Sequence, residues 1–187
     1  MAAARAALDI STALLEKHRR GDDDAHVRGP EVHGLTLNYR GGPLSHDDRT
    51  DAGALRAGDR APDATTATAD GRPIRLFNLF RGPHWTLLTF GAAYAHTAAT
   101  LSDRFGPALH AYTVVRPGES ANEHALVDSH GHLWAGYVAN DDTLVLVRPD
   151  GYIGLITNSG NIERVTEYWT ALHGIPITGD AATMPGA

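Results

Sequence analysis

Apolar and polar positions along the chain separate into runs that predict alternating strands and helices. Three runs are apolar or β-branched over six or seven residues, as expected for strands buried on both faces: 85–90, 109–115 and 143–148. Apolar residues three or four positions apart predict helices at 2–20 and 162–173. A third helix, at 95–105, follows directly after the first buried strand.

Turn-forming residues predict two hairpins. Asp70-Gly71 separates two short extended segments, and Pro149-Asp150-Gly151 separates a strand from its return. The segments that flank these turns are 65–69, 73–76, 143–148 and 152–156. Short helical segments are predicted at 76–80 and 133–137, and a polar turn is predicted at 128–132. Alternating residues allow a strand at 32–39, and a polar loop is predicted at 45–50. The tail at 176–187 is expected to be frayed.

The order of these elements predicts an α/β protein with the topology of the thioredoxin-like fold. A strand–helix–strand unit is followed by a hairpin and a last helix, so we expect a central mixed sheet flanked by helices. The helix at the N-terminus and an irregular connector precede this unit. We therefore divide the chain into residues 1–55 and a thioredoxin-like domain at 56–187.

Composition excludes several classes of function. The 187 residues are 42% hydrophobic and carry a net charge of -6, which argues against binding to nucleic acid or an anionic membrane surface. We find no apolar run long enough to span a bilayer and no signal peptide, so a cytoplasmic location is expected. The absence of cysteine excludes disulfides, thiolate nucleophiles and iron–sulfur clusters.

The junction between the strand at 85–90 and the helix at 95–105 is where an α/β fold would place its chemistry. A helix N-terminus offers unpaired N–H groups and positive potential. In this chain the junction holds Ala95, His96, Thr97 and Ala98, with no thiol or carboxylate. The scaffold is therefore predicted to be present without reactive atoms.

Four segments resemble the C-terminal domain of FAD-dependent aromatic hydroxylases of the para-hydroxybenzoate-hydroxylase type, especially the phenol and polyketide hydroxylases. They are Arg-Ala-Gly-Asp-Arg-Ala-Pro-Asp at 56–63, Asp-Gly-Arg-Pro-Ile-Arg-Leu-Phe-Asn-Leu-Phe-Arg-Gly at 70–82, Trp-Thr-Leu-Leu-Thr-Phe-Gly at 85–91 and Leu-Val-Arg-Pro-Asp-Gly-Tyr-Ile-Gly at 146–154. Laid against a thioredoxin, Ala95 and Ala98 occupy the positions of the two cysteines, and Asp142-Thr143 stands near the cis-proline loop.

This resemblance implies a domain that does no redox chemistry. It implies that residues 1–55 are the end of the hydroxylase body, and that FAD and NAD(P)H bind in the part that precedes this chain. No Gly-x-Gly-x-x-Gly follows a strand, so the chain has no dinucleotide fingerprint. We expect no catalytic, cofactor-binding or metal-binding residue here. The implied partners are the FAD-binding hydroxylase portion or a second copy, and the implied role is stability or oligomer assembly.

An independent ligand-binding module, or a small metal-dependent enzyme, is the alternative. Its best candidates are His130 and His132, with Asp128 and His124 nearby, since imidazole and carboxylate suit zinc or iron. A solvated turn explains the same residues. We expect His96 to be a surface residue of a helix, Arg148 to be solvated or ion-paired, and Asp150 to stabilise a turn. The three tryptophans are expected to pack in the core or at its edge: Trp85, Trp134 and Trp169.

Overall fold

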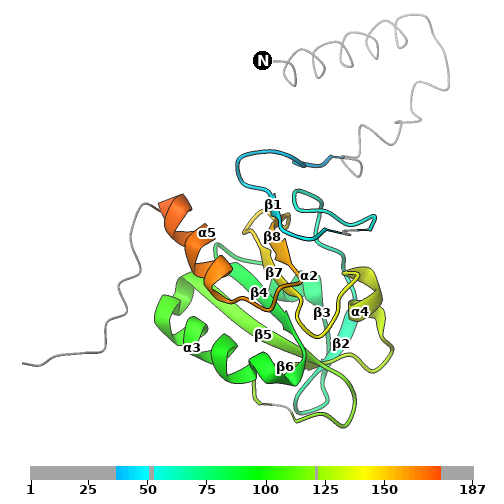
Figure 1. The fold of residues 1–187 in the computed structure, drawn as a ribbon. Helices are drawn as coiled ribbons and strands as arrows, with labels where there is room; N and C mark the ends of the chain where they lie inside the picture. The colour runs from blue at the N-terminus through cyan, green and yellow to red at the C-terminus, as the bar shows by residue number, and fades with distance from the viewer. Residues whose placement is uncertain (1–36, 51–52, 121, 174–187) are drawn as a thin grey trace, which may run out of the picture. The chain divides into compact units, whose positions relative to one another are not determined.

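A mixed sheet of eight strands forms the centre of the computed structural model, which describes residues 37–50, 53–120 and 122–173 (Figure 1). The strands are β1 (His46–Asp47), β2 (Thr65–Thr68), β3 (Pro73–Arg75), β4 (Trp85–Phe90), β5 (Leu109–Val115), β6 (Ala125–Val127), β7 (Leu144–Val147) and β8 (Ile153–Thr157). The helices are α2 (Leu76–Leu79), α3 (Ala95–Phe105), α4 (His132–Gly136) and α5 (Glu163–His173), with 3-10 turns η2 (Ala92–Tyr94) and η3 (Gly106–Ala108).

Strand β4 lies near the middle of the sheet and positions the elements around it. It pairs in parallel with β5, where Leu87 is opposite Ala111, and antiparallel with β7, where Leu87 is opposite Leu146. The order across the sheet is β1-β8-β7-β4-β5-β6-β2-β3. The parallel β4–α3–β5 unit and the β7–β8 hairpin followed by α5 confirm the predicted α/β arrangement.

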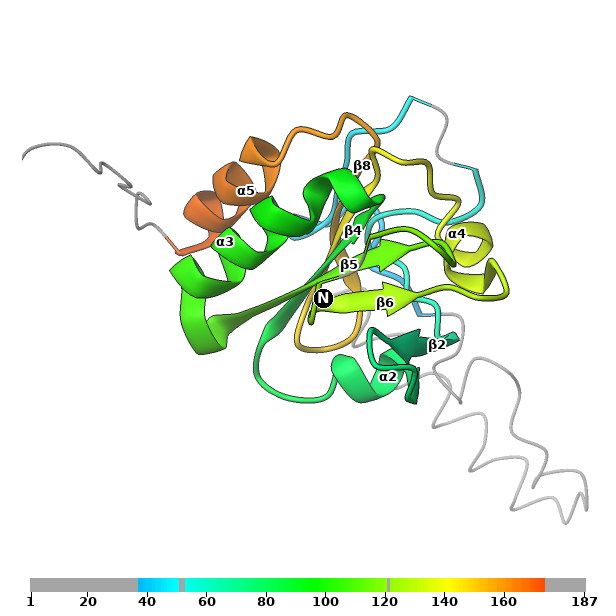
Figure 2. The same ribbon diagram turned by 90° about the horizontal axis from the view of Figure 1, so that it is seen from below.

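Helices α3 and α5 cover one face of the sheet (Figure 2). Leu101 of α3 and Val165 of α5 pack on Leu144 and Leu146 of β7 in one buried cluster. Because side chains of a strand alternate between faces, Val145 and Val147 of β7 point to the opposite side. Apolar side chains at every position of β7 therefore follow from a strand that is covered on both faces.

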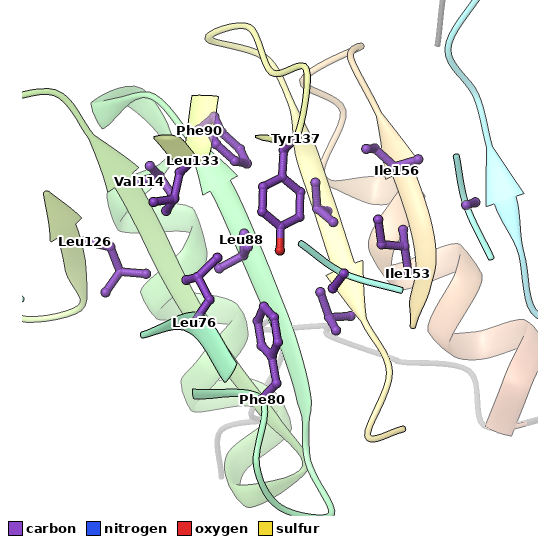
Figure 3. Packing of buried hydrophobic residues seen from close by; sticks show 14 residues of the cluster. Leu76, Phe80, Leu88, Phe90, Val114, Leu126, Leu133, Tyr137, Ile153 and Ile156 are labelled. Atoms are coloured by element: carbon purple, nitrogen blue, oxygen red, sulfur yellow. The ribbon is translucent and has the colours of Figure 1, made fainter. Parts of the chain in front are cut away.

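The second face packs against α2 and α4 (Figure 3). Leu76, the first residue of α2, and Phe80, the residue after the helix, belong to the same cluster as Leu88 of β4. Tyr137 follows α4 and is fully buried, and its hydroxyl donates a hydrogen bond of 2.8 Å to the carbonyl of Pro62. Burial raises the pKa of Tyr137 well above its ordinary value, so this hydroxyl keeps its proton.

The predicted elements agree closely with the structure where a strong apolar pattern defines them. The elements at 85–90, 95–105 and 109–115 have the predicted bounds, and β2, β3, α2, α4, β7, β8 and α5 differ from theirs by one residue at one or both ends. The predicted helix at 2–20 and most of the strand at 32–39 lie outside the described residues, and 37–39 carry no strand.

Two short strands correct the sequence reading. Strand β1 lies inside the segment predicted as a polar loop at 45–50, and β6 precedes the polar turn at 128–132. Both are held by their neighbours: β1 pairs in parallel with β8, and β6 pairs with β5 and β2. The domain boundary after residue 55 remains a prediction.

Among the described residues, no helix combines the length and the apolar character needed to cross a bilayer. Within this part of the chain the longest helices are α3 and α5, which have 11 residues each. They use one apolar face against the sheet and leave the other face polar.

Val138 has a backbone conformation that a β-branched residue rarely adopts. Its φ is +50°, and its side chain is 46% exposed. We expect Val138→Gly to raise the free energy of unfolding by about 0.5–1 kcal/mol, because glycine enters this left-handed region without a steric penalty. Urea titration would measure the change. Val138→Ala keeps part of the penalty and should change stability less. A glycine variant that is less stable than the wild type would contradict the prediction.

Candidate functional site

The strand-to-helix junction after β4 is the position that thioredoxin-like chemistry would occupy. Gly91 ends the strand with a φ of +96°, and a Cβ built on it would lie 2.9 Å from the carbonyl oxygen of Asp141. Ala95 begins α3, and Ala98 is buried against the sheet in the first turns of that helix. His96 lies exposed between them. The two positions that the resemblance assigned to cysteines therefore carry methyl groups.

The loop before β7 closes over this junction through polar contacts. The Tyr94 hydroxyl donates a hydrogen bond of 2.7 Å to the carboxylate of Asp142. Thr143 is fully buried, and its hydroxyl lies 3.0 Å and 2.8 Å from the side-chain oxygens of Asn140 and Asn158. Asp142-Thr143, placed by the resemblance near a cis-proline loop, thus sits beside the junction and is tied to it.

Tyr94 acts as a hydrogen-bond donor in this arrangement. Burial and the hydrogen bond to Asp142 together raise the pKa of Tyr94 to about 12. The phenol therefore keeps its proton at neutral pH and cannot serve as a base. A Cβ on Gly160 would lie 2.1 Å from the Tyr94 oxygen, so only glycine fits beside this contact. The junction is built as a packed and hydrogen-bonded corner.

The carboxylate of Asp128 caps helix α4. It is buried and accepts backbone N–H bonds from His132 at 3.0 Å, Leu133 at 2.9 Å and Trp134 at 3.1 Å. These amides belong to the first turn of a helix, where N–H groups have no partner within the helix. Both oxygens of Asp128 are therefore committed to the backbone.

The histidines of the candidate metal cluster do not assemble around Asp128. The rings of His130 and His132 stack with centroids 5.5 Å apart, and both residues are exposed. His124 lies 3.7 Å from Glu123. In the part of the chain that the structure describes, three or more His, Asp or Glu side chains nowhere gather as a metal would require. The geometry thus favours the solvated turn.

The remaining candidates have structural roles. The guanidinium of Arg148 pairs with Asp150, whose other oxygen accepts the N–H of Tyr152 at 3.2 Å within the β7–β8 turn. The tryptophans pack as expected: Trp85 and Trp169 meet edge to face with centroids 5.9 Å apart, and Trp134 meets Phe90 at 5.2 Å. The guanidinium of Arg116 lies 3.8 Å above the Trp134 ring.

Sequence reasoning missed a buried ion pair in the loop after β1. The side chain of Arg49 is buried and lies 3.0 Å from the carboxylate of Asp47, and it also donates to the carbonyl of Leu55. Burial alone would raise the pKa of Asp47, but hydrogen bonds from Arg49 and from the amide of Ala57 hold it below its ordinary value. A buried arginine without a partner would be strongly destabilising, and no pattern in the sequence indicates this pairing.

A stacked histidine pair was also missed. The rings of His84 and His110 lie 3.8 Å apart, and the ring of His84 contacts the carbonyl of Leu79 at 2.9 Å. Burial, followed by repulsion from His84 and His124, lowers the pKa of His110 below its ordinary value of 6.5. Below pH 6.5 the unfolded chain therefore binds more protons at this position than the folded protein does.

We expect this pair to make the protein less stable in mild acid. The free energy of unfolding should rise with pH up to about 6.5 and then level off, because above this value His110 is neutral in both states. In His110→Gln this part of the slope should disappear. Urea titrations between pH 5 and 8 measure it, with the exposed His96→Gln as control. Equal slopes in His110→Gln and the wild type would contradict the assignment.

A shallow pocket at the β7–β8 turn is the third feature that the sequence did not reveal. Its volume is about 260 Å³, and Arg60, Phe77 and Arg81 line it together with the turn at 149–151. The guanidinium of Arg60 lies 5.4 Å from the centre of the Phe77 ring. These residues come from separate segments, so only the fold brings them together.

Two flavin-dependent enzymes that are similar to this chain are much longer than it is. A flavin-dependent monooxygenase from Mycobacteroides abscessus is 38% identical over 168 residues, which are 90% of this chain and 28% of that protein. The crystal structure of aklavinone-11 hydroxylase in complex with FAD and aklavinone superimposes on this chain with a TM-score of 0.56 at 22% identity. The match covers 84% of this chain and 31% of the hydroxylase chain. The chain thus spans about a quarter to a third of the length of these proteins.

The fold is also similar to that of smaller thioredoxin-like proteins. A Chlorobium tepidum protein assigned as a thiol:disulfide interchange protein DsbE superimposes with a TM-score of 0.52 at 16% identity, over 63% of this chain and 98% of that one. This confirms the predicted thioredoxin-like class. The family model for the C-terminal domain of aromatic-ring hydroxylases matches residues 55–176. The chain therefore belongs to the family of aromatic-ring hydroxylase C-terminal domains.

Proposed function

We propose that this chain is a non-catalytic domain that stabilises an FAD-dependent aromatic-ring hydroxylase or supports its assembly. The observation that carries the proposal is the closed junction after β4. Methyl groups stand at Ala95 and Ala98, and the adjacent Tyr94 is held by Asp142. Dithiol exchange needs a thiolate as nucleophile, and the sequence contains no cysteine.

FAD and NAD(P)H bind, in this proposal, to the part of the hydroxylase that lies outside this chain. The sequence has no glycine-rich fingerprint after a strand, and the β4–α3 turn is occupied by Ala92 and Tyr94. The partner of the domain is the FAD-binding portion or a second copy of itself.

A test can use the Mycobacteroides monooxygenase from which the 168-residue matching stretch has been removed, here called the hydroxylase body. The body, purified with its yellow FAD, is heated alone and with this chain added. We expect the chain to raise the temperature of FAD release by several degrees or to change the body's sedimentation. The enzyme's own excised stretch is the positive control. If that control stabilises the body and this chain neither stabilises it nor associates with it, the proposal fails.

The same preparation tests the cofactor assignment and the alternative. The isolated chain should show no flavin absorbance, before or after incubation with FAD and gel filtration. It should also contain no stoichiometric zinc or iron by elemental analysis. Bound flavin would contradict the placement of the cofactor outside this chain. A bound metal that is lost in His130→Ala/His132→Ala would favour the metal-dependent enzyme instead.

A further inference from the structure

We propose that one surface of the domain docks on the FAD-binding portion of the hydroxylase by receiving carboxylates from it. This surface, called here the arginine–aromatic surface, consists of Tyr39, Arg60, Phe77 and Arg81. The inference rests on the proposed function and assigns that function to one place on the fold.

All four residues lie around the β7–β8 turn. The backbone of Arg60 forms an antiparallel bridge with Tyr152, and the Tyr152 ring meets the Tyr39 ring with centroids 4.7 Å apart. The guanidinium of Arg60 lies 5.4 Å from the Phe77 ring centre, and the 260 Å³ pocket joins Arg60 and Phe77 to Arg81. Residues 42 positions apart in the sequence are thus brought to one end of the sheet.

Two aromatic rings on this surface are open to solvent. Tyr39 is 49% exposed and Phe77 is 39% exposed. Tyrosine, phenylalanine and arginine are enriched in protein interfaces, and tyrosine and arginine are among the residues that most often dominate the binding energy. The surface formed by an exposed phenylalanine and two arginines therefore has the composition of a protein interface rather than that of an ordinary solvent-facing surface.

The two arginines of this surface have no acidic partner among the described residues. The acids nearby are already paired: Asp59 with Arg40, Asp63 with Arg75 and Asp150 with Arg148. Arg60 and Arg81 are exposed and line a partly apolar pocket, so their guanidinium N–H donors are available to a partner. The complementary partner is a surface that presents carboxylates, since guanidinium binds them with two parallel hydrogen bonds.

The position of the chain's entry favours the hydroxylase body as this partner. The compact unit begins at Asn38, and the next residue, Tyr39, donates its N–H to Gly58 at 2.7 Å on this same surface. The family is a C-terminal domain, and this chain spans 28% of the Mycobacteroides relative, so most of such a protein precedes the unit. The chain therefore enters this unit at a residue of the arginine–aromatic surface, and a partner tethered through that segment has a raised effective concentration at the surface.

Binding to the hydroxylase body tests the docking surface. The FAD-loaded body is titrated with this chain and with Arg60→Glu/Arg81→Glu, and the Kd is measured by sedimentation. We expect the double variant to bind about tenfold or more weakly, and wild-type binding to weaken as NaCl is raised from 50 to 500 mM. Arg72→Glu/Arg104→Glu makes the same change in net charge on exposed residues elsewhere and should bind like the wild type. Urea unfolding of each isolated variant verifies that the domain itself is intact.

The outcomes separate this inference from the proposed function. If the wild-type chain binds the body and Arg60→Glu/Arg81→Glu binds equally well, the surface is wrong while the function stands. If the enzyme's own stretch binds the body and this chain does not, the proposed function fails. If sedimentation of the chain alone reveals a dimer that the double charge reversal dissociates, the occupant is a second copy, and the assignment to the hydroxylase body is overturned.

Discussion

Asp128→Ala is expected to lower the free energy of unfolding by about 3 kcal/mol, measured by urea titration. The substitution removes a buried carboxylate that accepts three backbone N–H bonds at the start of α4. Loss of a helix cap costs about 1 kcal/mol, and each buried donor left without a partner adds about 1–3 kcal/mol before water enters. Leu133, which follows the cap, is fully buried in the core, and Trp134 packs against the same cluster, so water has limited access to replace the carboxylate.

The same experiment distinguishes a cap from a metal ligand. Asp128→Asn keeps one acceptor oxygen and should lose about half as much stability as the alanine variant. His130→Ala and His132→Ala, which remove the exposed imidazoles, should change stability by no more than about 0.5 kcal/mol. A metal site would give the opposite ranking, because loss of either imidazole, or addition of a chelator, would then destabilise the protein as strongly as loss of Asp128 does.

The strands and helices with strong apolar patterns could be predicted because their buried positions form a pattern within the element's own sequence. Strand β4 has buried side chains from Thr86 to Phe90, and β7 is buried throughout, so both appear in the sequence as unbroken apolar or β-branched runs. Strand β1 has only two residues, His46 and Asp47, and neither is a typical strand former. It exists because β8 offers an edge for it, which is a property of the assembled sheet.

In the candidate site, too, features that depend on a single residue type could be predicted, and contacts between distant segments could not. The loss of redox chemistry could be read from Ala95 and Ala98, because a missing thiol is visible in the sequence. The capping role of Asp128 could not be predicted, because Asp128 lies three residues before Gly131, the N-cap of α4, and the sequence allowed only a metal cluster or a solvated turn there. The contacts of Arg60 with Phe77, and of Arg49 with Asp47 and Leu55, depend on backbone segments that only the folded chain brings together.

Tyr137→Ala should be among the most damaging single changes, with a loss of about 4 kcal/mol in the free energy of unfolding. Tyr137 is the largest of the fully buried side chains and lies between Phe90 and the α2 residues in the core of the second face (Figure 3). Removing its ring leaves a cavity that the surrounding strands cannot fill, and substitutions of this kind typically cost 3–5 kcal/mol. Tryptophan fluorescence during urea titration reports the loss.

Two further variants divide this loss between packing and hydrogen bonding. Tyr137→Phe keeps the ring and removes only the hydroxyl that donates to the Pro62 carbonyl, so it should cost about 1 kcal/mol. Phe77→Ala removes a comparable ring from an exposed position and should cost no more than about 0.5 kcal/mol. The loss of unfolding free energy then distinguishes the core ring of Tyr137, which stabilises the fold, from the surface ring of Phe77, which contributes little to stability. If Phe77→Ala weakens binding to the hydroxylase body while leaving stability nearly unchanged, that ring is exposed for contact with the partner.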